Sequence, residues 1–306
     1  MALPTTPKGW AIRLTKIADL FHQVHGLDRF PIDVSSIAME FSRQVFPEEP
    51  ITLVHGASLP KGFDGMLAPN PSGNREWGIF YNDSISSRGR RNFTLAHELG
   101  HYLLHRTAYP DGLRCTSGNM GDWSTEVGQI EGEANTFASF LLMPLNDFRE
   151  QISGQVIDLD LMEHLSDRYA VSVTAAILKW LAITKKRAMV VVGKEGFIDW
   201  AWSSGPLIKS GVFYRARQEV VELPRNSLAA LDADPGHARR GATHKAGIWS
   251  QHEAVQEMTI FAPIREITIS LLLYPDASPS RWQMSELEEE TTPDAYDRFM
   301  SGSCGV

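Results

Sequence analysis

Three residues in the run His97-Glu98-Leu99-Gly100-His101 have the types and the spacing of a catalytic metal site. On a helix, side chains four residues apart lie on one face about 6 Å apart, so both imidazoles can reach one Zn²⁺ from the same side. Glu98 then points toward the open side of the metal, where it can act as general base on a metal-bound water. The run therefore predicts zinc-dependent hydrolysis of a peptide bond.

The surrounding segment supports this interpretation, because residues 92–105 have a helical pattern with several apolar residues that can pack inward. In a chain with ten histidines, however, such a run arises by chance with a probability of roughly a few per cent. The two histidines could then be ordinary, partly buried helix residues. A third ligand decides between the two interpretations, since a catalytic zinc has three protein ligands and a water.

One known arrangement of the third ligand is absent from this sequence. The metzincin pattern requires Gly at 104 and His at 107, where this chain has Leu104 and Thr107. His105 lies eight residues beyond His97, which on a helix is about 80° around the axis and about 12 Å along it, and we interpret it as a helix-end histidine. The gluzincin arrangement instead requires a glutamate on a later helix, and the segment EGEANTFASFLLMP provides one about thirty residues downstream.

Two glutamates of that segment compete for the role. Glu131 shares a helical stripe with Asn135, whereas Glu133 lies about 200° away around the axis. The small residues Ala134 and Ala138 would let this helix approach the zinc helix closely. We therefore expect Glu131 to be the third ligand of one Zn²⁺ per chain, Asn135 to hydrogen-bond a zinc histidine, and Glu133 to lie on a solvated face.

The two motifs together, FTLAHELGHYLLH and then EGEANTFASFLLMP, resemble the ImmA/IrrE family of metallo-endopeptidases, which are bacterial and phage regulators of the gluzincin type. The resemblance runs from about residue 10 to about residue 183. It implies cleavage of an intracellular protein, usually a DNA-binding repressor, in response to stress or to signals from mobile elements, and thus a role in transcription regulation. Many relatives carry a helix-turn-helix domain in front, whereas this chain begins directly with the peptidase portion.

The strand EWGIFYN, which precedes the zinc helix, is a candidate substrate-binding element. We expect it at the edge of its sheet beside the metal, where its backbone could pair with an extended substrate by strand addition. The candidate substrate-binding residues are Trp77, Gly78, Ile79, Phe80 and Tyr81.

The order of the predicted elements indicates an α+β fold with two domains. Residues 1–186 are expected to form a helical zinc-peptidase domain with a small antiparallel sheet, built from ITLVHG, FDGMLA and EWGIFYN. Residues 187–306 are expected to form a β-rich domain of unknown role, with a frayed acidic tail at 286–300. Helices are predicted at 9–25, after Asp33, and at 92–105, 125–142, 158–169 and 173–183, whereas 224–250 is predicted to be a loop.

Composition limits the other functional classes. The formal charge of −8 makes direct nucleic-acid binding improbable, although residues 165–181 have a helix-turn-helix pattern that leaves a DNA-binding regulator as an alternative. Cys115 and Cys304 lie too far apart in the sequence to suggest a disulfide framework, and no signal peptide or membrane-spanning stretch is visible, so a cytoplasmic location is expected.

A second alternative is a non-catalytic, zinc-stabilised regulator whose residues 187–306 bind a partner. Glu98 favours an enzyme, because a structural zinc site does not require an acid beside its first ligand. The sequence leaves open the substrate and its cleavage site, the inducing signal, the oligomeric state, and whether the thiolate of Cys115 blocks the metal.

Overall fold

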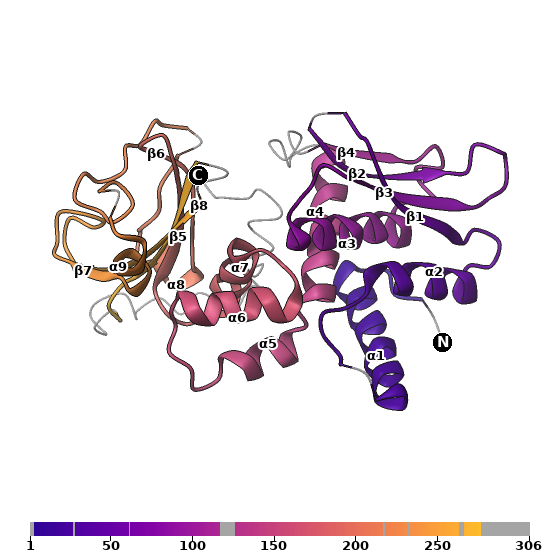
Figure 1. The fold of residues 1–306 in the computed structure, drawn as a ribbon, viewed down its shortest axis with the longest axis horizontal. Helices are drawn as coiled ribbons and strands as arrows, with labels where there is room; N and C mark the ends of the chain where they lie inside the picture. Colours follow the sequence, from indigo (N-terminus) through magenta and orange to yellow (C-terminus); the bar gives the residue numbers. More distant parts are fainter. Residues whose placement is uncertain are drawn as a thin grey trace. The chain divides into compact units, whose positions relative to one another are not determined.

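A computed structural model describes residues 3–26, 28–60, 62–116, 126–216, 218–231, 233–262 and 266–276 (Figure 1). These residues divide into two compact units, 3–153 with 165–172 and 154–164 with 173–276, and each unit is described by itself. The domain boundary expected near residue 186 stays a prediction. The acidic tail at 286–300 lies outside the described residues.

The expected α+β class is confirmed, because helices and sheets occur in separate stretches of the chain. The helices of the first unit are α1 (Pro7–His25), α2 (Val34–Val45), α3 (Arg88–Leu104), α4 (Glu126–Leu142) and α5 (Leu145–Ile152). Its strands are β1 (Ile51–Ala57), β2 (Phe63–Pro69), β3 (Trp77–Asn82) and β4 (Leu113–Thr116). Helix α6 (Leu159–Tyr169) has residues in both units.

The sheet of the first unit is mixed, so the expectation of a purely antiparallel sheet was wrong. Its strand order is β1-β3-β2-β4. Strand β3 runs parallel to β1 and antiparallel to β2, and β2 runs antiparallel to β4. In the sequence β3 follows β1 and β2, but in the sheet it lies between them. Ile79 therefore pairs with Val54 on one side and with Leu67 on the other.

The central position of β3 contradicts the prediction that this strand is a sheet edge for substrate. The backbone groups of Trp77, Gly78, Ile79, Phe80 and Tyr81 face strands on both sides, so they cannot pair with an added peptide. The physical reason is visible in the burial, since the first three residues of the strand are buried in succession, which is typical of an interior strand. Among the described strands, β1 and β4 form the edges.

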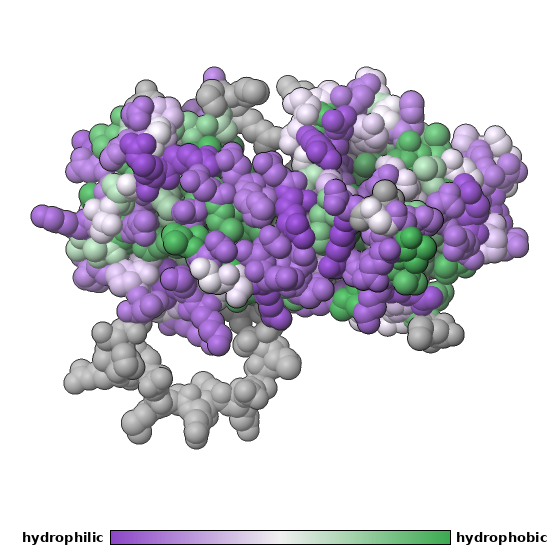
Figure 2. All heavy atoms as spheres, turned by 60° about the horizontal axis from the view of Figure 1, so that its bottom comes forward, coloured by the Kyte–Doolittle hydropathy of each residue, from purple (hydrophilic) through white to green (hydrophobic). Residues whose placement is uncertain are grey.

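Helix α1 is buried in its first half and largely exposed in its second half. Trp10 and Leu14 are 3% and 1% exposed and pack in the core, as expected. Ile17, Phe21 and Val24 continue the apolar spacing of the helix but are 47%, 54% and 71% exposed, because the second half of this long helix is not covered by described residues on that face. Hydrophobic residues of this kind form separate groups among the hydrophilic side chains that dominate the face drawn in Figure 2.

The second unit contains an antiparallel five-stranded sheet of order β6-β5-β9-β8-β7. Its strands are β5 (Ala188–Lys194), β6 (Phe197–Ser203), β7 (Ala242–His244), β8 (Val255–Ala262) and β9 (Ile267–Leu273), and its helices are α7 (Val173–Ile183), α8 (Gly205–Lys209) and α9 (Pro235–Arg240). The β-rich character expected after residue 186 is thus confirmed. The stretch 224–250, predicted to be a loop, also contains α9 and β7.

A buried carboxylate organises the interior of this second unit. Glu257 on β8 is 0% exposed and accepts hydrogen bonds from the backbone N–H groups of Leu228 and Ala229, both at 3.0 Å. The indole of Trp249 donates to it at 2.6 Å and the hydroxyl of Thr259 at 2.9 Å. A buried charge with this many donors is a structural element, because the donors replace the lost hydration.

No helix in the described part of the chain combines the length and the apolarity that are needed to cross a bilayer.

Candidate metal centre

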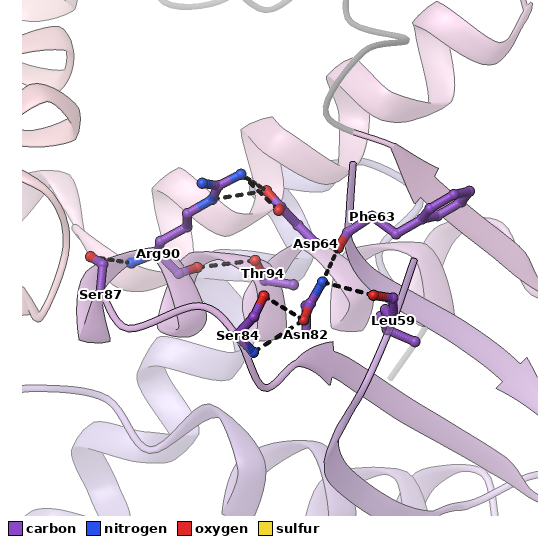
Figure 3. A network of polar contacts seen from close by, with 8 residues as sticks. All are labelled: Leu59, Phe63, Asp64, Asn82, Ser84, Ser87, Arg90 and Thr94. Carbon is purple, nitrogen blue, oxygen red and sulfur yellow. Dashed lines mark hydrogen bonds and ion pairs between the residues drawn. The ribbon is translucent and has the colours of Figure 1, made fainter. Parts of the chain in front are cut away.

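Polar contacts join the start of helix α3, which carries the His-Glu-x-x-His run, to the sheet. It begins at Arg88, four residues earlier than predicted, because the Ser87 hydroxyl caps it by accepting from the Arg90 N–H at 3.3 Å. The Arg90 guanidinium donates to both oxygens of Asp64 on β2, at 2.7 and 2.6 Å (Figure 3). Asn82, at the end of β3, donates to the carbonyl oxygen of Phe63 at 2.9 Å. The contact of Arg90 with Asp64 fixes α3 relative to β2, and that of Asn82 with Phe63 joins β2 to the end of β3.

Close packing against α4 fixes the other side of α3. A Cβ atom added to Gly100 would lie 3.0 Å from the ring of Phe137 and 3.1 Å from Cα of Ala134, so the two helices approach each other where side chains are small. Ala134 and Ala138 are fully buried. The prediction that small residues on α4 allow a close approach is confirmed at Ala134.

The two helices bring together the three residues predicted to hold the metal. His97 and His101 lie on α3 and Glu131 on α4, and one ligand atom from each lies within 4.8 Å of the others. Nε2 of His97 is 2.9 Å from Nε2 of His101 and 3.1 Å from Oε2 of Glu131. Nε2 of His101 is 3.4 Å from Oε1 of Glu131. All three residues are buried.

The second ring nitrogen of each histidine also has a polar neighbour. Nδ1 of His97 is 2.9 Å from Oδ1 of Asn135, one turn beyond Glu131 on α4. Nδ1 of His101 is 3.0 Å from Nδ1 of His105, the residue that caps the end of α3. Nε2 of His105 in turn lies 2.9 Å from Oε2 of Glu133. Glu133 is half exposed, in line with the expected solvated face, but its contact with His105 was not foreseen.

Burial and mutual contacts shift the pKa values of the three cluster residues in different directions. Burial raises the pKa of Glu131, but the hydrogen bonds and charges of His101 and His97 outweigh it and hold that pKa well below its usual range. Burial, together with the neighbouring His97, lowers the pKa of His101 to about 4. Burial lowers the pKa of His97 as well, but Glu131 and the charge of Glu98 outweigh this effect and raise it. At neutral pH the carboxylate of Glu131 is therefore ionised and His101 is uncharged.

The donor set fits a zinc ion. In the neutral form of His97 that donates its Nδ1–H to Asn135, the Nε2 lone pair faces Nε2 of His101 and the Glu131 carboxylate, so acceptors converge. A cation between them removes the repulsion. Tetrahedral zinc with bonds of about 2.0–2.1 Å separates its nitrogen and oxygen ligands by about 3.3 Å, close to the three distances in this cluster.

Glu98 lies beside this cluster, under a strand that approaches α3 closely. It is fully buried and adjacent to His97. A Cβ atom added to Gly65 on β2 would lie 2.6 Å from Oε1 of Glu98 and 2.5 Å from Cγ2 of Thr94. Only glycine therefore fits at position 65. Sequence reasoning missed this residue, because the glycine in FDGMLA shows its role only once β2 is placed over α3.

The first unit has a surface pocket that does not include the metal-ligand cluster. It has a volume of about 440 Å³ and is lined by residues such as Tyr81, Arg88 and Arg91. None of the proposed metal ligands lines it, so we assign the chemistry to the histidine and glutamate cluster on the basis of its donor geometry. The side chain of Cys115, considered above as a possible block on the metal, lies outside the described residues.

The family model of the IrrE N-terminal-like domain, Peptidase_M78, matches residues 61–181. The matched segment runs from just before β2 into α7 and contains all the residues of the cluster. No curated protein sequence matches the chain.

Proposed function

Since residues 61–181 form an IrrE N-terminal-like domain of the Peptidase_M78 family of metallopeptidases, we propose that this chain is a zinc-dependent endopeptidase that cleaves an intracellular regulatory protein, namely a DNA-binding repressor. The observation that carries the proposal is the convergence of His97, His101 and Glu131 within 4.8 Å, with the buried Glu98 next to the first of them. The three residues act as ligands and Glu98 as the general base.

In this proposal the zinc ion, when bound, lowers the pKa of a water to about 7 and polarises the carbonyl of the scissile bond. Glu98 takes a proton from the attacking water on its carboxylate, as the water oxygen bonds to the carbonyl carbon. It then gives that proton to the amide nitrogen as the carbon–nitrogen bond breaks. The products are one new carboxyl terminus and one new amino terminus, and Glu98 returns to its ionised form.

The substrate backbone needs a free sheet edge, and β3 does not provide one. Strand β4 pairs with β2 through residues such as Leu67 and Leu113, and has no second strand among the described residues. Because β2 also carries Gly65, which lies against Glu98, the β4 edge is on the side of the sheet nearest the general base. We therefore propose strand addition at β4, where main-chain pairing would hold a peptide with little demand on its sequence.

The number of ligands favours an enzyme over a zinc-stabilised binding protein. Within the described ranges, the cluster has three residues that could hold a metal, His97, His101 and Glu131. Structural zinc sites almost always have four protein ligands, whereas catalytic sites have three and leave one position for water. A buried acid next to the first ligand adds a group that only the catalytic role uses.

The test is incubation of the zinc-loaded protein with candidate repressors from its own genome, beside the Glu98→Gln variant. The glutamine should keep the fold and the zinc but lose cleavage, because its amide does not accept the proton of the water. Zinc content and circular dichroism of both proteins provide the controls. Cleavage by the variant at the wild-type rate would refute the mechanism, and zinc-loaded wild-type protein that cuts no candidate would favour the zinc-stabilised binding protein.

A further inference from the structure

Two residues outside the predicted ligand set form a continuous polar chain to one of the histidines. From Nδ1 of His101 the chain passes to Nδ1 of His105 over 3.0 Å, and from Nε2 of His105 to Oε2 of Glu133 over 2.9 Å. The imidazole of His101 is fully buried and that of His105 is 7% exposed, so solvent has little access to the two inner members. Only Glu133, at 52% exposure, meets the solvent.

The chemistry of these groups fixes where the protons lie. An ionised carboxylate only accepts hydrogen bonds, so Nε2 of His105 must carry a hydrogen and donate to Glu133. A neutral imidazole has one N–H group, and therefore Nδ1 of His105 is an acceptor. The hydrogen in the 3.0 Å contact must then belong to Nδ1 of His101. The remaining nitrogen of His101, Nε2, presents its lone pair to His97 and Glu131.

We propose that His105 and Glu133 are positioning residues, which hold His101 in the tautomer and orientation that a metal ligand requires. This inference rests on the proposed function, because it assigns the two residues to the same zinc site. Neither residue contacts the metal in this proposal. They act through His101, in the way that Asn135 acts through His97 at 2.9 Å on the other ligand.

The position of His105 in the sequence explains how one helix carries the ligand and its support. His105 follows His101 by four residues, one helical turn, and caps α3 by donating its backbone N–H to the carbonyl of His101. The two rings are therefore neighbours along one face, with centroids 5.1 Å apart. Glu133 comes from α4, so the chain also links the two helices that provide the metal ligands.

The expected effect is on metal affinity. Loss of a group that orients a metal-bound histidine typically lowers affinity by about 10–100-fold. His105→Phe removes the acceptor for Nδ1 of His101 and keeps a ring in the buried space, so it should lower zinc affinity by that range. His105→Asn places a side-chain oxygen near the former Nδ1 position and should recover most of the loss.

His105 is buried, so its variants could fail to fold. Variants of Glu133 avoid this problem, because the Glu133 side chain is half exposed. Glu133→Leu removes the acceptor for Nε2 of His105 and should lower zinc affinity by about tenfold. Glu133→Gln retains a carbonyl acceptor and should recover most of that affinity. Glu150→Leu, an exposed substitution on α5, is the matched control for adding a surface leucine.

The decisive measurements are zinc affinity by competition with a chelator and the tautomer of His101 from long-range ¹H–¹⁵N correlation spectra of the metal-free protein. We expect the Nδ1–H form in the wild type and mixed or Nε2–H signals in His105→Phe and Glu133→Leu. Circular dichroism confirms folding. A pure Nε2–H form in the wild type, or unchanged zinc affinity in both folded variants, would overturn the inference.

The two proposals fail differently. The tautomer is measured without metal and without substrate, so a protein that cuts no repressor can still show the predicted Nδ1–H form of His101. Conversely, a zinc-loaded wild type that cleaves a repressor, with His105→Phe and Glu133→Leu binding zinc normally, would keep the proposed function and refute the role of His105 and Glu133.

Discussion

A single added methyl group at Gly65 should separate catalysis from metal binding. In Gly65→Ala the new Cβ would lie 2.6 Å from Oε1 of Glu98, and ordinary contacts begin at 3.4 Å, so the carboxylate has to retreat by a large part of an ångström. The other close neighbour is Cγ2 of Thr94 at 2.5 Å, which belongs to the same helix, so the added Cβ also overlaps sterically with the side chain of Thr94. The three atoms nearest to this Cβ belong to Thr94 and Glu98, and none belongs to His97, His101 or Glu131.

A misplacement of about 1 Å in a catalytic group costs about 100-fold in rate, or about 2.7 kcal/mol. We therefore expect Gly65→Ala to lose about two orders of magnitude in kcat/KM while zinc affinity changes by less than about threefold, since no ligand is touched. The crowding should also lower the free energy of unfolding by about 1–3 kcal/mol. Thermal unfolding measures this effect and sets the temperature at which activity is compared.

The assay is the rate of repressor cleavage by zinc-loaded protein, with zinc content measured on the same sample. Gly205→Ala is the matched control, because a Cβ there meets nothing within 4 Å and its backbone has no left-handed conformation. Full activity of Gly65→Ala would show that Glu98 is not constrained by β2 as described. Loss of zinc together with activity would show that the strand supports the ligands rather than the base.

Three further substitutions test the two units. Glu131→Gln should weaken zinc binding by about 100-fold or more, since it replaces a charged ligand in a three-ligand site, and a smaller loss than in Glu133→Gln by chelator competition would contradict the assignment. Asp147→Asn should cost about 1–3 kcal/mol at pH 7, because Asp147 accepts from the Arg168 guanidinium at 2.8 and 2.9 Å. Burial raises the pKa of Asp147, but hydrogen bonds from Arg168 and Tyr169 outweigh burial, so the pKa of Asp147 in the folded protein is lowered. The stability difference between wild type and Asp147→Asn should therefore be largest above the pKa of the unfolded state. It should vanish as the pH falls through the lowered pKa of the folded state. Glu257→Ala should destabilise the second unit by about 3 kcal/mol or more in urea unfolding, since several buried donors lose their acceptor, with zinc affinity unchanged.

The parts of the site that depend on one helix could be predicted from the sequence. His97 and His101 are one turn apart, so their shared face follows from the period of the helix. The choice of Glu131 over Glu133 used the same period on a second helix. The structure places the Glu131 carboxylate 3.1 Å from the His97 imidazole, although its role as ligand stays a proposal.

The parts that depend on long-range pairing could not be predicted. The short strand β4 lies in a turn-rich stretch and becomes a strand only by pairing with β2, as between Leu113 and Leu67. The central position of β3 depends on which strands it pairs with, and the alternation of side chains along a strand does not specify these partners. His105 was compared with His97, eight residues away, whereas the contact that matters is with His101, four residues away.

Helix α5 was missed for a local reason. Pro144 follows the helix predicted at 125–142, and α4 does end at Leu142. The same proline is the N-cap of α5, where its missing N–H costs nothing because the first N–H groups of a helix have no partner within the helix. A proline between two helical segments can therefore end one helix and begin the next.

The burial of α3 determines how its backbone amides exchange with solvent. Every residue from Ala96 to Leu103 is buried, because the sheet covers one side of the helix and α4 another. We therefore expect the backbone amides of this stretch to exchange through global unfolding of the first unit, so that their hydrogen exchange measures its global stability. Because zinc binds the folded form, zinc at 100 times its dissociation constant should slow that exchange by about 100-fold, equivalent to about 2.7 kcal/mol.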